Sequence, residues 1–170
     1  MKIGYRYGRV AVIFLLGVLM AGMKGSTEGF SIFFGAGLLI TAFLTLIYLF
    51  INFDKKVNEK LIMEMILEAF AGLVIFTYPM SDNAFFVIVF SFWVTIMGVF
   101  LLTAGLYDKK NKDYQWFYIL LGIVMILFGF TILHVTKENS GITGYLISFI
   151  LLIYALAGGY LIKKRKEDIY

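Results

Sequence analysis

Residues 84–110 read AFFVIVFSFWVTIMGVFLLTAGLYDKK, a long apolar run that ends in an aspartate and a pair of lysines. The same lysine pair closes two other apolar stretches, at Lys55-Lys56 and Lys163-Lys164, so the pattern recurs every 54 residues. Each period contains two apolar segments, each near the ~20 residues that a helix needs to cross a hydrocarbon core of about 30 Å. The repeating unit is therefore predicted to be a membrane hairpin of two helices.

Three such hairpins predict an all-α fold, an integral membrane bundle of six transmembrane helices that forms one domain over residues 1–170. The hairpins are expected at about 5–53, 61–107 and 114–162. Their helices are expected at about 5–23, 29–53, 61–78, 84–107, 114–134 and 142–162. Helices are favoured over strands because barrel strands would alternate in polarity over about ten residues. The first segment is expected to be retained as a helix and not removed as a signal peptide.

The composition agrees with a membrane protein. Hydrophobic residues make up 61% of the chain and charged residues 15%, whereas soluble domains are about half apolar and about a quarter charged. The absence of cysteine excludes disulfides and thiolate metal sites, and a single histidine argues against a histidine-built metal site. We therefore expect neither a metal nor a cofactor.

The positive charges predict the orientation of the chain. All of the 15 lysines and arginines except Lys24 and Lys137 lie before Val10, where the first uninterrupted apolar run begins, after the last segment, or between consecutive hairpins. Short loops rich in positive residues stay on the cytoplasmic face, so both termini are expected to be cytoplasmic. The net charge of +4 thus reflects membrane topology, and no nucleic-acid partner is expected.

Glu64 and Glu68 are the residues least expected inside a membrane. They lie one turn apart in the third segment, about 5 and 10 Å from its start at Leu61. An intramembrane charge costs on the order of 3 kcal/mol, so it usually faces the bundle interior, binds a proton or finds a partner. Three hypotheses stay open for this pair: an ion pair that orients helices, a proton or cation site, and snorkelling toward the lipid surface.

The repeat offers a partner for the glutamates. One glycine in the first helix of each hairpin can be aligned with the others, and these are Gly17, Gly72 and Gly122. This alignment places Arg9, Glu64 and Tyr114 at equivalent depths. It predicts that Arg9 and Glu64 pair near the cytoplasmic face.

Small residues are spaced for close contact between helices, because lipid provides no hydrophobic drive for helix association. The expected packing positions are Gly17, Gly72, Gly98, Gly105, Gly122, Gly129 and Gly159. Two hydroxyl pairs, Thr41 with Thr45 and Ser91 with Thr95, either bond across helices or bond back to their own carbonyls. His134 is expected at the outer end of the fifth helix, as an ordinary interfacial residue or as a sensor of external acid. Pro79 is expected to end the third helix.

Residues 69–79 (AFAGLVIFTYP) and 120–129 (LLGIVMILFG) are followed by a second apolar helix and a basic end. In these features and in its repeat number the chain resembles the HdeD-like acid-resistance membrane proteins, a family of two-helix repeats of unknown biochemical function. The resemblance implies a six-helix bacterial inner-membrane protein linked to acid stress, and it transfers no catalytic residue. The first and third hairpins lack the outer proline, and Glu64 and Glu68 match no family motif.

Two classes of function follow. The first is a non-enzymatic membrane protein that acts in acid or envelope stress through lipids, a second copy of itself or another membrane protein. The alternative is a small transporter or proton-conducting protein that uses Glu64 and Glu68. An enzyme is not expected, because the short loops contain no nucleophile with a base and no metal site.

Overall fold

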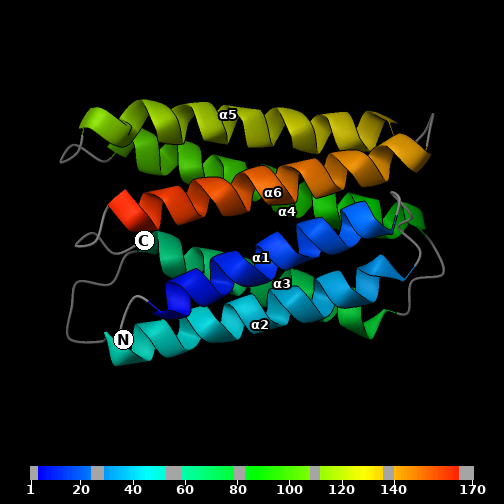
Figure 1. Ribbon diagram of the computed structural model, residues 1–170, viewed down its shortest axis with the longest axis horizontal. Helices are drawn as coiled ribbons and strands as arrows, with labels where there is room; N and C mark the ends of the chain where they lie inside the picture. The colour runs from blue at the N-terminus through cyan, green and yellow to red at the C-terminus, as the bar shows by residue number, and fades with distance from the viewer. Residues whose placement is uncertain are drawn as a thin grey trace.

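The computed structural model describes residues 4–23, 29–52, 59–78, 83–107, 112–135 and 140–164, and these segments form six helices (Figure 1). The helices are α1 (Gly4–Gly22), α2 (Phe30–Ile51), α3 (Glu59–Thr77), α4 (Asn83–Tyr107), α5 (Lys112–Val135) and α6 (Ser140–Lys164). Each begins and ends within two residues of the range expected from the sequence. Pro79 and most of the expected loops lie outside the described residues.

Five of the six described helices are long and apolar enough to cross a membrane. The exception is α3, which has 19 residues, as α1 does, but contains four charged side chains. Large apolar side chains cover the outside of the bundle, for example Phe43, Phe70 and Leu120, each more than 60% exposed. A surface of this kind suits lipid and not water, so the chain has the character of a multi-pass membrane protein.

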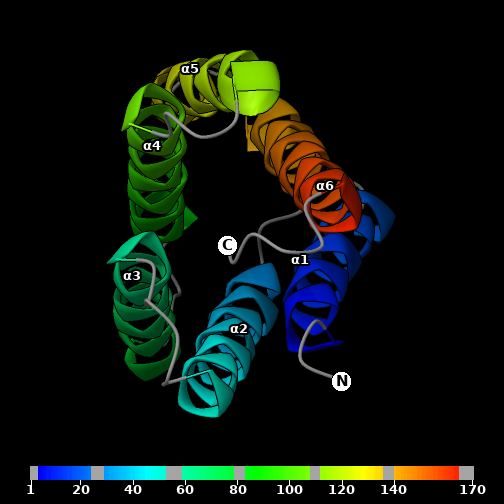
Figure 2. The same cartoon turned by 90° about the vertical axis from the view of Figure 1, so that its left-hand side faces the viewer.

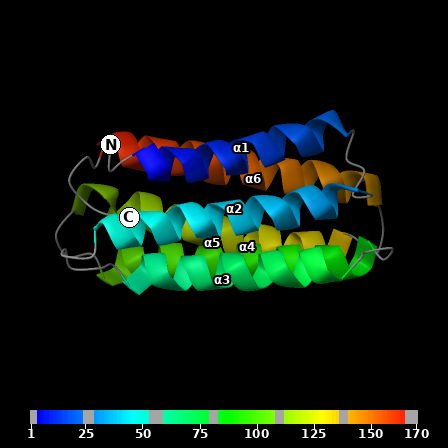
Figure 3. The same cartoon turned by 90° about the horizontal axis from the view of Figure 1, so that it is seen from below.

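The six helices run along one axis and form a closed ring in chain order, with α6 beside α1 (Figure 2). Successive helices alternate in direction, so the start of α1 and the end of α6 lie at the same end of the bundle (Figure 3). We call this end, which carries Arg6, Arg9, Lys60, Lys163 and Lys164, the basic end. The opposite end is the far end.

The helices do not pack equally around the ring. The closest packing joins α2 to α3, α4 to α5 and α6 to α1, whereas α3 to α4 and α5 to α6 are much looser. The closest contacts therefore link consecutive hairpins of the sequence prediction, and the last helix pairs with the first. The sequence analysis did not predict this pairing.

Glycines allow the close packing. A Cβ atom on Gly122 would lie 2.8 Å from the carbonyl oxygen of Gly98, and a Cβ atom on Gly98 would lie 2.8 Å from the carbonyl oxygen of Gly122. Gly105 and Gly129 also face the α4–α5 contact, while Gly72 faces α2 and Gly17 faces α6. Gly159 differs from these, because its Cβ position is at an ordinary 3.6 Å from Val10. Close backbone approach of this kind is how helices gain van der Waals contact in lipid.

The same spacing recurs at the three close contacts. On each odd-numbered helix, one glycine contacts two residues of the helix that precedes it in the ring. One is a small residue, and the other is a leucine four positions after that small residue. The three sets are Gly72 against Gly35 and Leu39, Gly122 against Gly98 and Leu102, and Gly17 against Ser148 and Leu152. Ser148 Oγ donates a hydrogen bond of 2.8 Å to the carbonyl oxygen of Gly17, which joins α6 to α1.

Aromatic rings fill the interior toward the far end. Their centroids lie 5.1–6.0 Å apart, and all of them are at most 1% exposed. We call them the aromatic core: Phe30, Phe34, Phe86, Phe90 and Trp93. Trp93 reaches toward the basic end and meets the ring of Tyr154 edge to face. The far half of the ring is therefore packed with side chains.

We predict that Gly122→Ala destabilises the protein by about 1–3 kcal/mol, because the new methyl group meets backbone atoms of Gly98 and Leu102 that cannot move away cheaply. Thermal unfolding in detergent measures the change. Gly159→Ala is the matched control, since its methyl group has room and alanine favours the helix by up to about 1 kcal/mol. Equal effects of the two substitutions would contradict the close contact at Gly122.

Candidate functional site

Charged side chains gather inside the ring near its basic end. Arg6 and Arg9 lie three residues apart on α1, and Lys60, Glu64 and Glu68 lie at intervals of four on α3. Residues at these spacings share one face of a helix. In both helices that face is turned inward, and Glu64 and Glu68 are only 2% and 0% exposed. Neither carboxylate snorkels to the lipid surface, so that hypothesis from the sequence is wrong.

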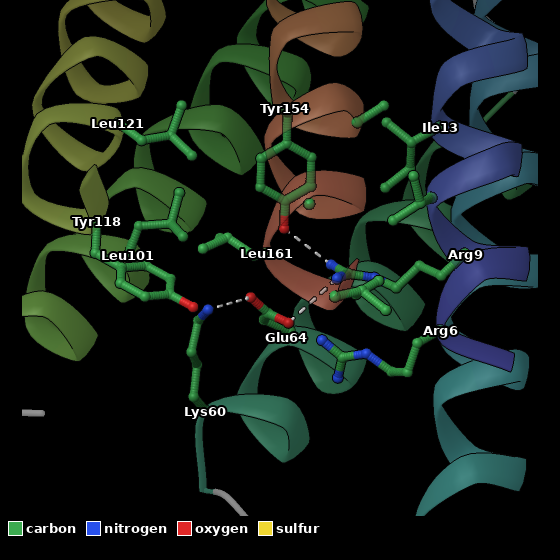
Figure 4. Close-up of a pocket in the computed structure, with 14 residues that line it drawn as sticks. Arg6, Arg9, Ile13, Lys60, Glu64, Leu101, Tyr118, Leu121, Tyr154 and Leu161 are labelled. Atoms are coloured by element: carbon green, nitrogen blue, oxygen red, sulfur yellow. Dashed lines mark hydrogen bonds and ion pairs between the residues drawn. The ribbon is translucent and has the colours of Figure 1, made fainter. Parts of the chain in front are cut away.

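Arg9 holds both glutamates. Its Nη2 and Nε atoms donate to Glu68 Oε1 over 2.5 and 3.1 Å, and its Nη1 lies 3.4 Å from Glu64 Oε2. The pairing of Arg9 with Glu64 that the glycine alignment predicted is present (Figure 4). Glu68 is nevertheless the closer partner, and the alignment gave no sign of this.

Two further residues complete the network. Lys60 Nζ lies 3.4 Å from Glu64 Oε1, and it also lies 5.6 Å from the ring centroid of Tyr118. Tyr154 on α6 accepts a hydrogen bond of 3.0 Å from Arg9 Nη2 (Figure 4). We call Arg6, Arg9, Lys60, Glu64, Glu68 and Tyr154 the polar cluster. The sequence pattern predicts a loop at Lys60, although the spacing of Lys60 and Glu64 is that of a helical ion pair. It predicts no special role for Tyr154.

Arg6 is the member of the cluster with unused donors. Its guanidinium lies 5.7 Å from the ring centroid of Tyr48, and the residue is 8% exposed. Among the residues that the structure describes, its Nε and Nη1 atoms have no hydrogen-bond partner. From the sequence, Arg6 is expected only to help determine topology.

A cavity of about 40 Å³ lies beside these groups (Figure 4). Arg6, Arg9, Lys60 and Glu64 form its polar wall, and Tyr118 and Tyr154 border it. The rest of its lining is apolar and includes Leu101, Leu121 and Leu161. A polar cavity of this size has room for at least one water molecule.

The ion pairs make the buried charges tolerable. A charge moved out of water costs several kcal/mol, and attraction to a partner offsets this cost only where the geometry is good. Glu64 contacts two cations, while Glu68 accepts two hydrogen bonds from Arg9 through one oxygen. The second oxygen of Glu68, Oε2, is buried without a partner among the described residues. Glu64 therefore contacts cations through both of its oxygens, whereas Glu68 does so through one oxygen only.

The other polar residues from the sequence lie elsewhere or bond locally. Thr41, Thr45 and Thr95 donate to carbonyl oxygens of their own helices, at Leu38, Thr41 and Ser91 respectively. These three hydrogen bonds are local to α2 and α4. His134 is exposed in the last turn of α5, far along the helix from the polar cluster.

Comparison with protein families found one match. Residues 63–134, from α3 to α5, are similar to the family described as "Short repeat of unknown function (DUF308)". The matched segment contains Glu64 and Glu68 but neither Arg6 nor Arg9. Comparison with curated proteins found no match, and none was found among solved structures either.

We predict that Arg9→Gln destabilises the protein by about 3–5 kcal/mol, because it leaves two buried carboxylates without their shared cation. Thermal unfolding in detergent measures the loss. Adding Glu68→Gln removes the carboxylate whose cation has been lost, while Glu64 keeps Lys60, so the second substitution should recover much of the stability.

Lys164→Gln serves as the matched control, since it removes an exposed cation at the same end of the bundle. It should change stability by no more than about 0.5 kcal/mol. A similar loss in Arg9→Gln and Lys164→Gln would show that the buried ion pairs contribute little.

Proposed function

We propose that this chain is a six-span, non-enzymatic protein of the bacterial inner membrane that acts in acid or envelope stress, as the HdeD-like proteins that it resembles are expected to do. The observation that carries the proposal is the buried contact of Arg9 with Glu64 and Glu68. This contact joins α1 to α3 across the interior, next to an aromatic core that is already packed. The polar cluster thus holds α1 and α3 together inside the bundle and does not line an open channel.

The ion pairs of the polar cluster give the protein a direct response to acid. Protonation of Glu64 or Glu68 removes a negative charge that Arg9 and Lys60 contact. Those cations then stay buried without a full complement of partners, which is costly. We infer that acidification loosens the basic end of the bundle and changes the surface that it presents to lipid or to another protein.

The sixth span in this proposal is α3. Its outward face is apolar from Met63 to Phe76, with Met63, Ile66, Phe70, Leu73 and Phe76 all more than half exposed. Lys60, Glu64 and Glu68 face inward, where they are paired. Intramembrane charges that face a bundle interior and pair with one another are tolerated, so the charged residues do not argue against a membrane span.

Three hairpin repeats account for the recurring contacts around the ring. The glycines aligned from the sequence, Gly17, Gly72 and Gly122, each meet a leucine and a small residue on the preceding helix of the ring. Duplication of one hairpin explains why three separate contacts use the same spacing. The cationic residues at the basic end support an orientation with both termini in the cytoplasm.

A second candidate, a small transporter or proton-conducting protein, is favoured by one observation. Glu68 Oε2 is buried without a hydrogen-bond partner among the described residues, next to an oxygen that binds Arg9. An unpartnered carboxylate oxygen can accept a proton. In this candidate Glu64 and Glu68 would carry protons along the interior.

The proposed stress role predicts a phenotype. Cells that lack the gene should survive an acid challenge less well, and expression of the wild-type chain should restore survival. Expression of Glu64→Gln/Glu68→Gln should not restore it, because that variant no longer has carboxylates to titrate. Lys164→Gln should restore survival as the wild type does. Survival is measured by colony counts at equal protein levels in the membrane.

Proton flux into proteoliposomes separates the two candidates. Under an imposed pH gradient, liposomes with the wild-type protein should take up protons no faster than empty liposomes. Flux in the wild type that is lost in Glu64→Gln/Glu68→Gln would instead establish the conducting candidate. Full restoration of acid survival by the same double variant would count against a response to acid through the ion pairs of the polar cluster.

The chain has no cysteine, so single cysteines can report its orientation. A membrane-impermeant maleimide added to intact cells should label His134→Cys, which is exposed in the last turn of α5 toward the far end. It should label Lys164→Cys, at the basic end, only after the membrane is permeabilised. The reverse pattern would overturn the proposed orientation, and labelling of both in intact cells would overturn the placement of the two sites across the membrane.

A further inference from the structure

The guanidinium of Arg6 points into the cavity of the polar cluster and has donors to spare (Figure 4). More than nine-tenths of the residue is buried. Its Nε and Nη1 atoms lack partners among the described residues. The ring centroid of Tyr48 lies 5.7 Å from the group, and the Nε and Nη1 donors are available to a ligand that lies in the guanidinium plane.

The charges around the cavity do not balance. Among the described residues the cluster has three cations, Arg6, Arg9 and Lys60, against the two carboxylates Glu64 and Glu68. Arg9 and Lys60 are the cations that contact the carboxylates. The uncompensated positive charge therefore lies at Arg6, where burial makes it costly.

The tyrosines that face the cluster do not change this balance. Tyr48, Tyr118 and Tyr154 come from α2, α5 and α6, and phenol groups are neutral near pH 7. Among the described residues, Glu64 is the one acidic residue in the cavity wall, and both of its oxygens contact cations. Its negative charge is thereby screened from the cavity.

We propose that this cavity binds one small monovalent anion, of about the size of chloride, with the edge of Arg6 as its principal ligand. A single negative charge neutralises the excess of one positive charge, whereas a divalent anion would leave a new imbalance. The volume of about 40 Å³ accommodates an ion not much larger than a water molecule. The leucines of the wall offer no hydrogen bonds to a hydration shell, which favours a weakly hydrated anion.

Thermal unfolding of the full chain in nanodiscs of zwitterionic lipid tests the site. Chloride or bromide replaces gluconate at constant ionic strength, since gluconate is too large for the cavity. The wild-type melting temperature should rise saturably, by about 2–4 °C when the anion reaches about five times its Kd. Arg6→Gln should show no saturable rise, and the control Lys164→Gln should respond as the wild type does.

A direct measurement of chloride binding tests the site even where Arg6→Gln folds poorly. The ³⁵Cl resonance of chloride should broaden in the presence of the wild-type protein, and excess bromide should reverse the broadening. Arg6→Lys, which keeps the charge but loses the planar edge, should bind with reduced affinity. Absence of broadening in the wild type, or an equal response in Arg6→Gln, would overturn the proposal. Loss of the chloride response when anionic lipid is added would overturn it as well, because a lipid phosphate would then be the occupant.

Discussion

The pairing of Arg9 with two glutamates is the constraint on which the rest of the bundle depends. A guanidinium among apolar helices is tolerable only when carboxylates lie within reach, and here they come from α3, a helix that α2 separates from α1 in the ring. The contact therefore crosses the interior instead of following the wall. It fixes the distance between two helices that do not pack against each other closely, and through Tyr154 it also fixes α6.

The interior is divided between two kinds of packing. Toward the far end, aromatic rings from α2 and α4 fill the space by contact alone. Toward the basic end, long charged side chains leave a small cavity among them. Trp93 and Tyr154 meet where the two kinds of packing join. This pair of rings is therefore the point at which the polar cluster contacts the aromatic core.

The sequence predicted the helices well, because apolar runs bounded by charged loops leave little choice in a membrane. It also placed Arg9 and Glu64 at one depth, since the glycine alignment depends only on helical rise. It could not predict that Glu68 is the closer partner, because that depends on side-chain rotamers across the interior. Arg6 and Tyr154 were not singled out, because an arginine near a helix start and a tyrosine among apolar residues have common, non-functional explanations.

The sequence also could not predict which neighbouring helices pack most closely in the ring. A hairpin suggests that its two helices pack on each other, yet the closest contacts join consecutive hairpins. The reason lies in where the small residues point: Gly35 and Gly98 face the helix that follows them in the chain. Those directions depend on how each helix is rotated about its axis, and a weak hydrophobic periodicity in lipid does not specify that rotation.

The polar cluster lies where the proposed repeat breaks. At one depth the three odd-numbered helices carry Arg9, Glu64 and Tyr114, and one turn further on they carry Ile13, Glu68 and Tyr118. Three identical hairpins would carry the same residue at the equivalent position of each odd-numbered helix, so they could not place a cation opposite an anion there. In the proposed repeat, divergence at these positions would convert a symmetric scaffold into one with an ion-paired site. The glycine contacts that build the ring could stay alike, while the chemistry of the interior depends on the positions that differ.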